Sequence, residues 1–258
     1  MTKITLQGIA WDEKSSYQRG PAKAPPLIRK ALHSGSMNLG SELGRILNEE
    51  VLHDAGDFLI QDYFDIERIT AKHLAEGNKV FSLGGDHSMT YPIMRAYAKH
   101  YPELAILQID AHSDLYAEFE GDPHSHACPF ARIMEKGLAA RLVQVGIRTL
   151  NPHQAEQAER FGVEIHEMKT LDLSQPFHFQ RPLYLTLDLD GLDPAYAPGV
   201  SHHEPGGLTS REVISLIQRV EANIVGADIV EYNPDRDHRD MTAFLAAKLL
   251  KEIVGRML

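Results

Sequence analysis

Residues 105–116 place a short apolar run directly before three side chains that can ligate a metal ion. Residues 105–109 have the composition of a buried strand, and Asp110, His112 and Asp114 follow at alternate positions. Alternate side chains of an extended chain share one face, so we expect these three to converge on one point. Such a cluster is also compatible with a calcium loop or a solvated acidic turn, so the rest of the chain must decide its role.

Apolar strands and helices alternate along the whole chain. The hydrophobic pattern predicts strands at 3–9, 79–85, 104–110, 141–147, 183–188 and 223–230, and helices at 27–33, 65–76, 86–100, 129–136, 152–161, 210–221 and 241–254. Ser210 stands where an N-cap of the helix 210–221 is expected. With 258 residues the chain is long enough for one large core. We therefore expect a single α/β domain over 1–258, with a parallel sheet covered by helices on both faces.

Four of the predicted strands run into polar side chains where they end. The four segments are Gly84-Gly-Asp-His87, Asp110-Ala-His-Ser-Asp114, Asp188-Leu-Asp190 and Glu231-Tyr-Asn-Pro234. In an open α/β sheet, ligands bind at the carboxyl ends of the strands. The sequence therefore predicts a functional site where these four segments meet at one edge of the sheet.

Six of these side chains are suitable ligands for divalent cations. They comprise four carboxylates and two imidazoles: Asp110, Asp114, Asp188, Asp190, His87 and His112. The set exceeds the needs of one ion, and its hard oxygen donors without a thiolate favour Mn²⁺ over structural Zn²⁺. Cys128, the only cysteine, is more often a small buried apolar side chain than a ligand. His87 could alternatively be an ordinary residue at a helix N-terminus that bonds locally.

The charge and the cysteine content limit the class of protein. The net charge is -10, which argues against nucleic acid or an anionic membrane as a partner and is compatible with a small cationic substrate. One cysteine excludes an intrachain disulfide and fits a reducing compartment. No apolar run reaches the roughly 18 residues of a membrane span, and residues 1–5 lack the apolar stretch of a signal peptide. We expect a cytoplasmic protein with no membrane partner.

Three segments resemble the signature blocks of the ureohydrolase family of arginases and agmatinases. They are 84–88 (Gly-Gly-Asp-His-Ser), 110–114 (Asp-Ala-His-Ser-Asp) and 186–194 (Thr-Leu-Asp-Leu-Asp-Gly-Leu-Asp-Pro). Further segments are similar to plant-type arginases and also to some microbial agmatinases: 119–121, 125–127, 130–135, 142–148, 199–208 and 226–234. The resemblance implies a three-layer arginase-like fold around a mostly parallel eight-stranded sheet. It also implies two Mn²⁺ ions per chain and a homotrimer or homohexamer.

The same resemblance implies how the ligands are divided between two ions. One ion would be held by His87, Asp110, Asp114 and Asp188. The other ion would be held by Asp110, His112, Asp188 and Asp190. Asp110 and Asp188 would then bridge the two ions.

The resemblance also implies roles for residues that do not bind the ions. Glu231 matches the glutamate that holds the guanidinium group of the substrate, and His126 matches a loop histidine that assists proton transfer. His124, two residues earlier, is a rival for His126. The departing amine must be protonated, and the general acid would be His126 or the metal ligand Asp114. Alternatively, Glu231 has only a structural role, as an acidic residue at a strand end that caps a neighbouring turn.

The activity that the resemblance implies is metal-dependent hydrolysis of a linear guanidino compound to urea and an amine. The likeness to plant-type arginases favours L-arginine, with L-ornithine as the amine, while agmatine, with putrescine as the amine, and other guanidino acids stay open. Tyr116 stands two residues after Asp114, where animal-type arginases carry an Asn that binds the α-carboxylate. Glu118 and Glu120 would favour an ammonium tail if they faced the substrate, and would otherwise form an exposed acidic loop.

Two other classes of protein stay open as alternatives. A deacetylase with a related fold would use a single Zn²⁺ and fewer ligands, which the intact second-metal set of His87, Asp114 and Asp190 disfavours. A catalytically inactive binding protein would be expected to have lost ligands, and none of the six is missing from this sequence.

Overall fold

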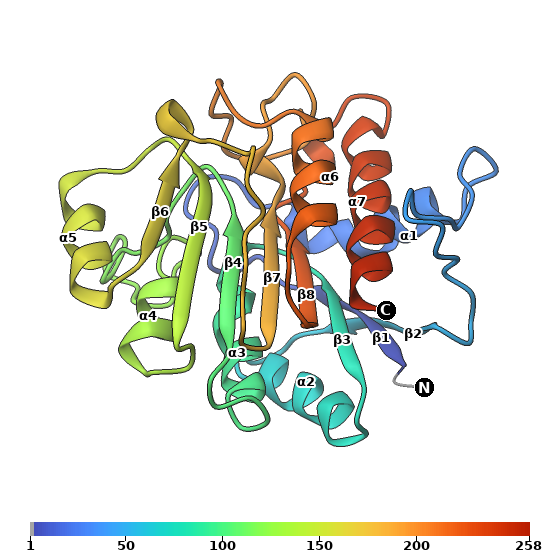
Figure 1. Cartoon of the computed structure of the whole chain (residues 1–258), viewed down its shortest axis with the longest axis horizontal. Coiled ribbons are helices and arrows are strands. Elements are labelled where there is room, and N and C mark those ends of the chain that lie inside the picture. The colour runs from blue at the N-terminus through green and yellow to red at the C-terminus, as the bar shows by residue number, and fades with distance from the viewer. Residues whose placement is uncertain (1–2) are drawn as a thin grey trace.

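The computed structural model describes residues 3–258 and contains one eight-stranded sheet (Figure 1). The strands are β1 (Ile4–Ala10), β2 (Leu52–Leu59), β3 (Lys79–Leu83), β4 (Ala105–Ile109), β5 (Arg141–Ile147), β6 (Glu164–Glu167), β7 (Leu183–Asp188) and β8 (Ile224–Val230). Their order across the sheet is β2-β1-β3-β8-β7-β4-β5-β6, and all neighbouring pairs are parallel. The expected α/β architecture is confirmed. The single domain over 1–258 stays a prediction, and residues 1 and 2 lie outside the described residues.

Helices cover both faces of the sheet, which confirms the three-layer arrangement (Figure 1). They are α1 (Ala24–Leu32), α2 (Asp65–Ala75), α3 (Thr90–Tyr97), α4 (Pro129–Glu135), α5 (Pro152–Phe161), α6 (Ser210–Arg219) and α7 (Met241–Met257). Helices α1, α6 and α7 share one buried apolar cluster, whereas α2, α3 and α4 share a second. Within the described part of the chain, no helix combines the length and the apolar composition that crossing a membrane requires.

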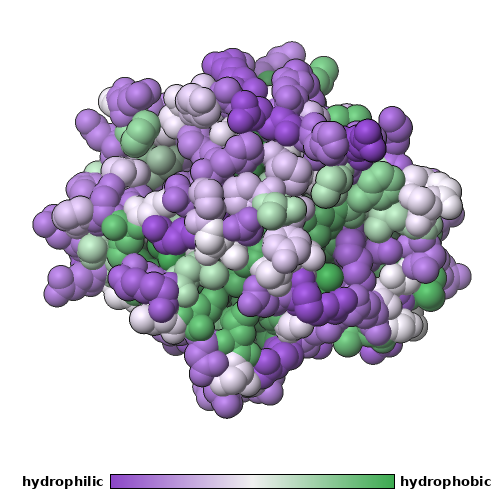
Figure 2. Space-filling view, turned by 90° about the horizontal axis from the view of Figure 1, so that it is seen from above, coloured by the Kyte–Doolittle hydropathy of each residue, from purple (hydrophilic) through white to green (hydrophobic). Residues whose placement is uncertain are grey.

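Strand β4 shows why the central strands were predictable. All five of its residues are buried, because it has a neighbouring strand on each side and a helical layer on each face. Leu107 belongs to the cluster of α1, α6 and α7, and Ile106 belongs to the cluster of α2, α3 and α4. A strand buried on both faces needs a nearly continuous apolar run, and that run is the signal in the sequence. On the face that Figure 2 shows, hydrophilic side chains predominate, and hydrophobic ones are seen mainly in recesses between them.

The hydrophobic pattern missed β2 and β6, which are the two edges of the sheet. An edge strand has a neighbour on one side only, so many of its side chains reach solvent and need not be apolar. In β2 all eight residues are half-buried or exposed, and β6 has no buried residue. Neither strand therefore contains the apolar run or the strict alternation by which strands are predicted.

Two details of the predicted helices are wrong. Ser210 is the first residue of α6 and not its N-cap, because Thr209 forms the capping box. In this box the Thr209 hydroxyl accepts from the backbone N–H of Glu212 at 3.1 Å, and the Glu212 carboxylate accepts from that of Thr209 at 2.8 Å. The expected helix 86–100 is shorter, since a 3-10 turn over His87–Met89 precedes α3 and α3 ends at Tyr97.

Candidate metal centre

The four polar segments that follow predicted strands meet at one edge of the sheet, as expected. They follow β3, β8, β7 and β4, which are consecutive neighbours in the sheet. Asp110 and Glu231 come directly after β4 and β8, and Asp188 is the last residue of β7. His87 begins a 3-10 turn that follows β3 after residues 84–86, and Asp190 lies in a 3-10 turn that directly follows β7. Since parallel strands present their carboxyl ends on one side, these side chains become neighbours.

Gly191 allows two of these segments to touch. A Cβ atom at this position would lie 2.9 Å from the backbone nitrogen and 3.0 Å from the Cα atom of Asp110. Any larger residue would push the turn that carries Asp190 away from Asp110. The Asp190 carboxylate also accepts a hydrogen bond from the backbone N–H of Ala111 at 3.2 Å, which fixes this close approach.

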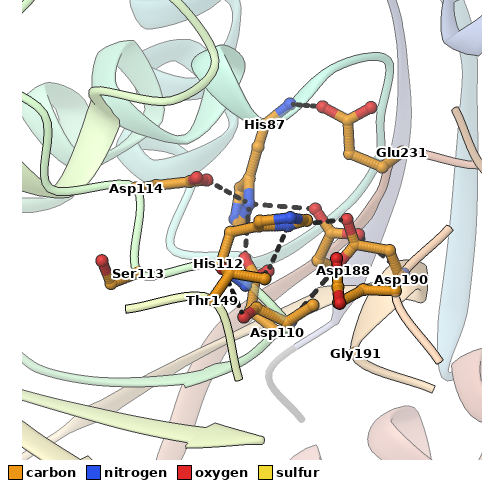
Figure 3. Close-up of polar contacts among 12 residues, drawn as sticks. His87, Asp110, His112, Ser113, Asp114, Thr149, Asp188, Asp190, Gly191 and Glu231 are labelled. Atoms are coloured by element: carbon orange, nitrogen blue, oxygen red, sulfur yellow. Dashed lines mark hydrogen bonds and ion pairs between the residues drawn. The ribbon is translucent and has the colours of Figure 1, made fainter. Parts of the chain in front are cut away.

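The first cluster surrounds the buried imidazole of His87 (Figure 3). Its Nδ1 atom lies 3.1 Å from Asp110 Oδ2, 3.1 Å from Asp114 Oδ2 and 3.2 Å from Asp188 Oδ2. The other ring nitrogen, Nε2, lies 2.9 Å from the hydroxyl of Thr186. If Nε2 donates its proton to Thr186, Nδ1 directs a lone pair toward three carboxylates, which is an arrangement that a cation among these four groups would stabilise.

The second cluster consists of Asp110, His112 and Asp190. His112 Nδ1 lies 3.0 Å from Asp190 Oδ2 and 3.7 Å from Asp110 Oδ1. Asp110 therefore belongs to both clusters, as the predicted bridging ligand should. Asp188 lies beside His87 in the first cluster, and its contribution to the second ion stays a prediction.

The expected extended geometry at 110, 112 and 114 is wrong, and the three side chains do not converge on one point but divide between the two clusters. Strand β4 ends at Ile109, and Asp114 has a φ of 50°, in the left-handed region. The Asp110 carboxylate accepts from the backbone N–H of His112 at 2.7 Å and thereby bends the chain directly after the strand. As a result, Asp110 and Asp114 both face His87, whereas His112 turns toward Asp190.

The electrostatics of the clusters fit divalent cations. Burial, together with the nearby charges of Asp190 and Asp114, raises the pKa of Asp110 to about 7. Burial and the charges of Asp190 and Asp110 likewise raise the pKa of Asp188 well above its ordinary value. Carboxylates that crowd one another in a buried site resist ionisation unless positive charge is supplied. The donor set, with four carboxylates, two imidazoles and no thiolate, suits Mn²⁺ or a similar ion.

Glu231 and His126 form a buried pair beside the clusters. Glu231 Oε1 accepts from the backbone N–H of His87 at 2.8 Å and lies 2.8 Å from His126 Nδ1. The backbone N–H of Ser16 donates to the other ring nitrogen, His126 Nε2, at 3.1 Å. Burial disfavours the charged imidazole, but the Glu231 carboxylate outweighs burial and raises the pKa of His126 to about 9. The imidazole thus lies between the Glu231 carboxylate, which favours a proton on Nδ1, and the Ser16 N–H group, which donates to a lone pair on Nε2.

The positions of the two candidate loop histidines differ. His126 is buried and lines the cavity at the clusters. His124 packs instead in an aromatic group, stacked on Tyr91 with ring centroids 5.7 Å apart and tilted against Tyr63 at 5.5 Å. His126 is therefore the histidine whose position suits proton transfer.

One cavity opens onto both clusters. Besides metal-ligand candidates, Glu231 and His126, its lining contains residues to which the sequence analysis assigned no role: Ser16, Tyr116, Phe119, Ala127, Thr149, Gln154 and His202. Ser16 could have been suspected, because its loop follows the carboxyl end of β1 at the same edge of the sheet. Glu118 and Glu120 are exposed and do not line the cavity. Of the two alternatives for these residues, the exposed acidic loop is therefore the one that the structure supports. Cys128 is buried outside the clusters.

Comparisons with known proteins agree with this arrangement. A family model described as "Arginase family" matches residues 2–255. The chain is 43% identical to arginase 1, mitochondrial, of Arabidopsis thaliana, over 98% of this chain and 80% of the relative, and 35% identical to an agmatinase of Bacillus anthracis, over 98% and 91%. The solved structure of arginase from Medicago truncatula superposes with a TM-score of 0.94 at 40% identity, covering 99% of this chain and 87% of that one.

Proposed function

This chain belongs to the arginase family, and we propose that it hydrolyses a linear guanidino compound to urea and an amine, with L-arginine as the substrate. The observation that carries the proposal is one cavity that opens onto two carboxylate and histidine clusters joined by Asp110, with the carboxylate of Glu231 in its wall.

The charges in the cavity suit a guanidinium group. The carboxylates of Asp110, Asp114, Asp188 and Asp190 would balance two divalent ions. Glu231 lines the same cavity, and its carboxylate, which already pairs with His126, can also attract a singly charged cation. A planar carboxylate matches the edge of a planar guanidinium group and can accept two of its N–H donors. The two hydrogen bonds to Oε1 fix the direction in which Glu231 presents its charge.

Two divalent ions, when bound, supply a water molecule of lowered pKa beside the substrate carbon and stabilise the charge that develops there. The residues of the chain do the remaining work. Glu231 orients the guanidinium carbon, and His126 gives a proton to the departing amine, since it contacts Glu231 and lines the same cavity. Asp114 is the second candidate for the general acid, because it belongs to the first cluster and also lines the cavity.

The outer wall of the cavity favours arginine over agmatine. Apart from the clusters, Glu231 and the imidazoles of His126 and His202, the cavity lining within residues 3–258 is uncharged. The hydroxyl of Ser16 and the NH₂ group of Gln154 can donate to a carboxylate, and the hydroxyl oxygens of Ser16 and Thr149 can accept from an ammonium group, as the α-end of an amino acid requires. The lone ammonium group of agmatine would meet no carboxylate of its own there. Agmatine remains the second candidate, because agmatinases are among the relatives.

The finer expectations form part of the proposal. We propose Mn²⁺ as the native ion and a homotrimer or homohexamer as the assembly. The cytoplasmic location stays a prediction, and the relative from Arabidopsis thaliana is named as mitochondrial. A single-zinc deacetylase is disfavoured, because the second cluster with His112 and Asp190 is complete.

Urea release tests the proposal. Purified protein loaded with Mn²⁺ is incubated with L-arginine, agmatine and other guanidino compounds, and urea is measured together with the amine product. We expect the highest kcat/KM with L-arginine, and loss of activity on chelation. A higher kcat/KM with agmatine than with L-arginine would identify agmatine as the preferred substrate. No urea from any guanidino compound would refute the proposed activity.

A further inference from the structure

A row of six buried polar side chains crosses the sheet beneath the metal ligands. In the order of strands β1, β3, β8, β7, β4 and β5, they are Gln7, Ser82, Asp228, Thr186, Gln108 and Gln144, and all are fully buried. Each is the register partner of the next, so the six side chains point to one face of the parallel sheet. This face is covered by α2, α3 and α4. Buried polar groups are costly without partners, so their contacts indicate what the row does.

Gln108 joins the row directly to the metal ligands. It lies two residues before Asp110 and donates from Nε2 to Asp110 Oδ2 at 2.7 Å. The same nitrogen donates to the backbone carbonyl of His112 at 3.0 Å. One amide group therefore holds the carboxylate that the two clusters share and the backbone of a second ligand.

Gln144 holds Gln108 from the neighbouring strand. Its Nε2 atom donates to Gln108 Oε1 at 2.6 Å and to the backbone carbonyl of Ser113 at 2.7 Å. Ser113 directly precedes Asp114, whose backbone is in the left-handed region. The two glutamines thus contact the ligand-bearing segment 110–114 at three of its five residues.

The chemistry of the contacts leaves one orientation for each amide. The ionised Asp110 carboxylate and the His112 carbonyl only accept hydrogen bonds, so Gln108 must present its NH₂ group to them. Its oxygen must then face Gln144, which in turn must present its own NH₂ group to that oxygen and to the Ser113 carbonyl. Gln144 Oε1 is the last atom of this series of hydrogen bonds and has no hydrogen-bond partner within the described residues. The direction of the hydrogen bonds is therefore set by the Asp110 carboxylate at the other end of the series.

We propose that Gln108 and Gln144 are positioning residues for the metal centre, which set the orientation of the shared ligand Asp110 and of segment 110–114. The inference rests on the two-ion site of the proposed function. A carboxylate oxygen can accept one hydrogen bond and still ligate an ion, and such a second contact restricts its rotation and increases metal affinity. Neither glutamine lines the cavity, so neither touches the substrate.

Direct measurement of Mn²⁺ binding by calorimetry tests the inference without turnover. Gln108→Met keeps the shape of the side chain but removes both donors, and we expect its Mn²⁺ affinity to fall roughly 10- to 100-fold. Gln144→Met removes the hydrogen bonds to Gln108 and to the Ser113 carbonyl but leaves the one from Gln108 to Asp110 in place, so we expect a smaller loss of several-fold.

The matched control is Gln7→Met, at the far end of the same row. Gln7 is equally buried and donates to Thr70 and Ser82, but it contacts no metal ligand. This variant should lose thermal stability of the metal-free protein as the others do, and should keep wild-type Mn²⁺ affinity.

The outcomes separate this inference from the proposed function. Mn²⁺ affinities of Gln108→Met and Gln7→Met that are both unchanged, or that fall equally, would overturn the positioning role. If Gln108→Met does not fold, Gln144→Met decides, and wild-type affinity in that variant would also overturn it. A wild-type protein that binds no pair of ions would refute the two-ion site itself.

Discussion

At the scale of single residues, Asp110 organises the centre. Its two oxygens face different clusters, and its backbone position directly after β4 was evident from the sequence. All six ligand candidates are therefore predictable, since each stands at a strand end or within a few residues of one. Their pairing was not predictable, because it depends on the bend at Asp110 that turns His112 toward Asp190 and Asp114 toward His87.

Excess Mn²⁺ should not restore activity to a variant that lacks a ligand of both clusters, but it should partly restore activity to a variant that lacks a ligand of one cluster. Asp110→Ala removes a carboxylate from both clusters, so turnover should be lost at any Mn²⁺ concentration. Asp188→Ala should behave in the same way if Asp188 also bridges. His87→Ala affects one cluster, and excess Mn²⁺ should restore part of its activity. Titration of activity with Mn²⁺ measures the difference, and equal rescue of the aspartate and histidine variants would contradict the sharing.

The role of Glu231 is testable because it is not among the ligands. Glu231→Gln keeps the shape but loses the charge that would pair with the guanidinium group. We expect kcat/KM to fall by roughly tenfold or more, with kcat also lowered, while the Mn²⁺ content stays the same. Glu118→Gln is the control, since this nearby carboxylate is exposed and outside the cavity. Unchanged kcat/KM in a fully loaded Glu231→Gln protein would remove Glu231 from the mechanism.

At the scale of elements, prediction succeeded where the signal is local and failed where tertiary contacts decide. The central strands carry their own apolar runs, so β4, β5, β7 and β8 were found close to their true bounds. The edge strands β2 and β6 are defined by pairing with one neighbour and carry no such run. The far wall of the cavity was missed for the same reason, since residues such as Ser16 and Gln154 come from separate loops and helices.

The N-cap of α6 gives a test at this scale. Thr209→Ala removes the side chain that caps the helix, and we expect it to lower the free energy of unfolding by about 1 kcal/mol. Ser210→Ala, one residue further on, should have a much smaller effect, because Ser210 is already helical. Urea denaturation of the metal-free variants measures both changes. Greater destabilisation by Ser210→Ala than by Thr209→Ala would show that Ser210 is the N-cap, as the sequence predicted.

Glu42 links the first turn of α6 to α7 and should make stability depend on pH. Hydrogen bonds from Arg211 and Lys248 lower the pKa of Glu42 from 4.5 to about 2. A carboxyl whose pKa is lowered by folding stabilises the protein above its unfolded pKa, and this contribution is lost as the pH falls through about 4.5 toward 2. Screening by solvent keeps the contribution small, since the group is largely exposed.

The measurement is Tm as a function of pH between 5 and the onset of acid unfolding. Glu42→Gln should show a smaller decrease of Tm across this range than the wild type. Glu49→Gln is the control, because Glu49 is exposed and makes no ion pair among residues 3–258. If Glu42→Gln and Glu49→Gln follow the wild-type curve alike, the contacts of Glu42 do not contribute in solution.

At the scale of the whole molecule, the fold brings distant segments to one place. Residues 87, 110, 188 and 231 span more than half of the chain, yet the parallel sheet puts the ends of β3, β4, β7 and β8 side by side (Figure 1). The buried polar row then supports this edge from beneath, and the helical layers seal the sheet on both faces. The central claim is that the two clusters are one centre for two ions.

Anomalous diffraction from crystals grown with Mn²⁺ tests that claim most directly. We predict two anomalous peaks per chain, roughly 3.5–4 Å apart, one beside His87 and the other beside His112, with Asp110 between them. A single peak at saturating Mn²⁺, or two peaks too far apart to share Asp110, would contradict it.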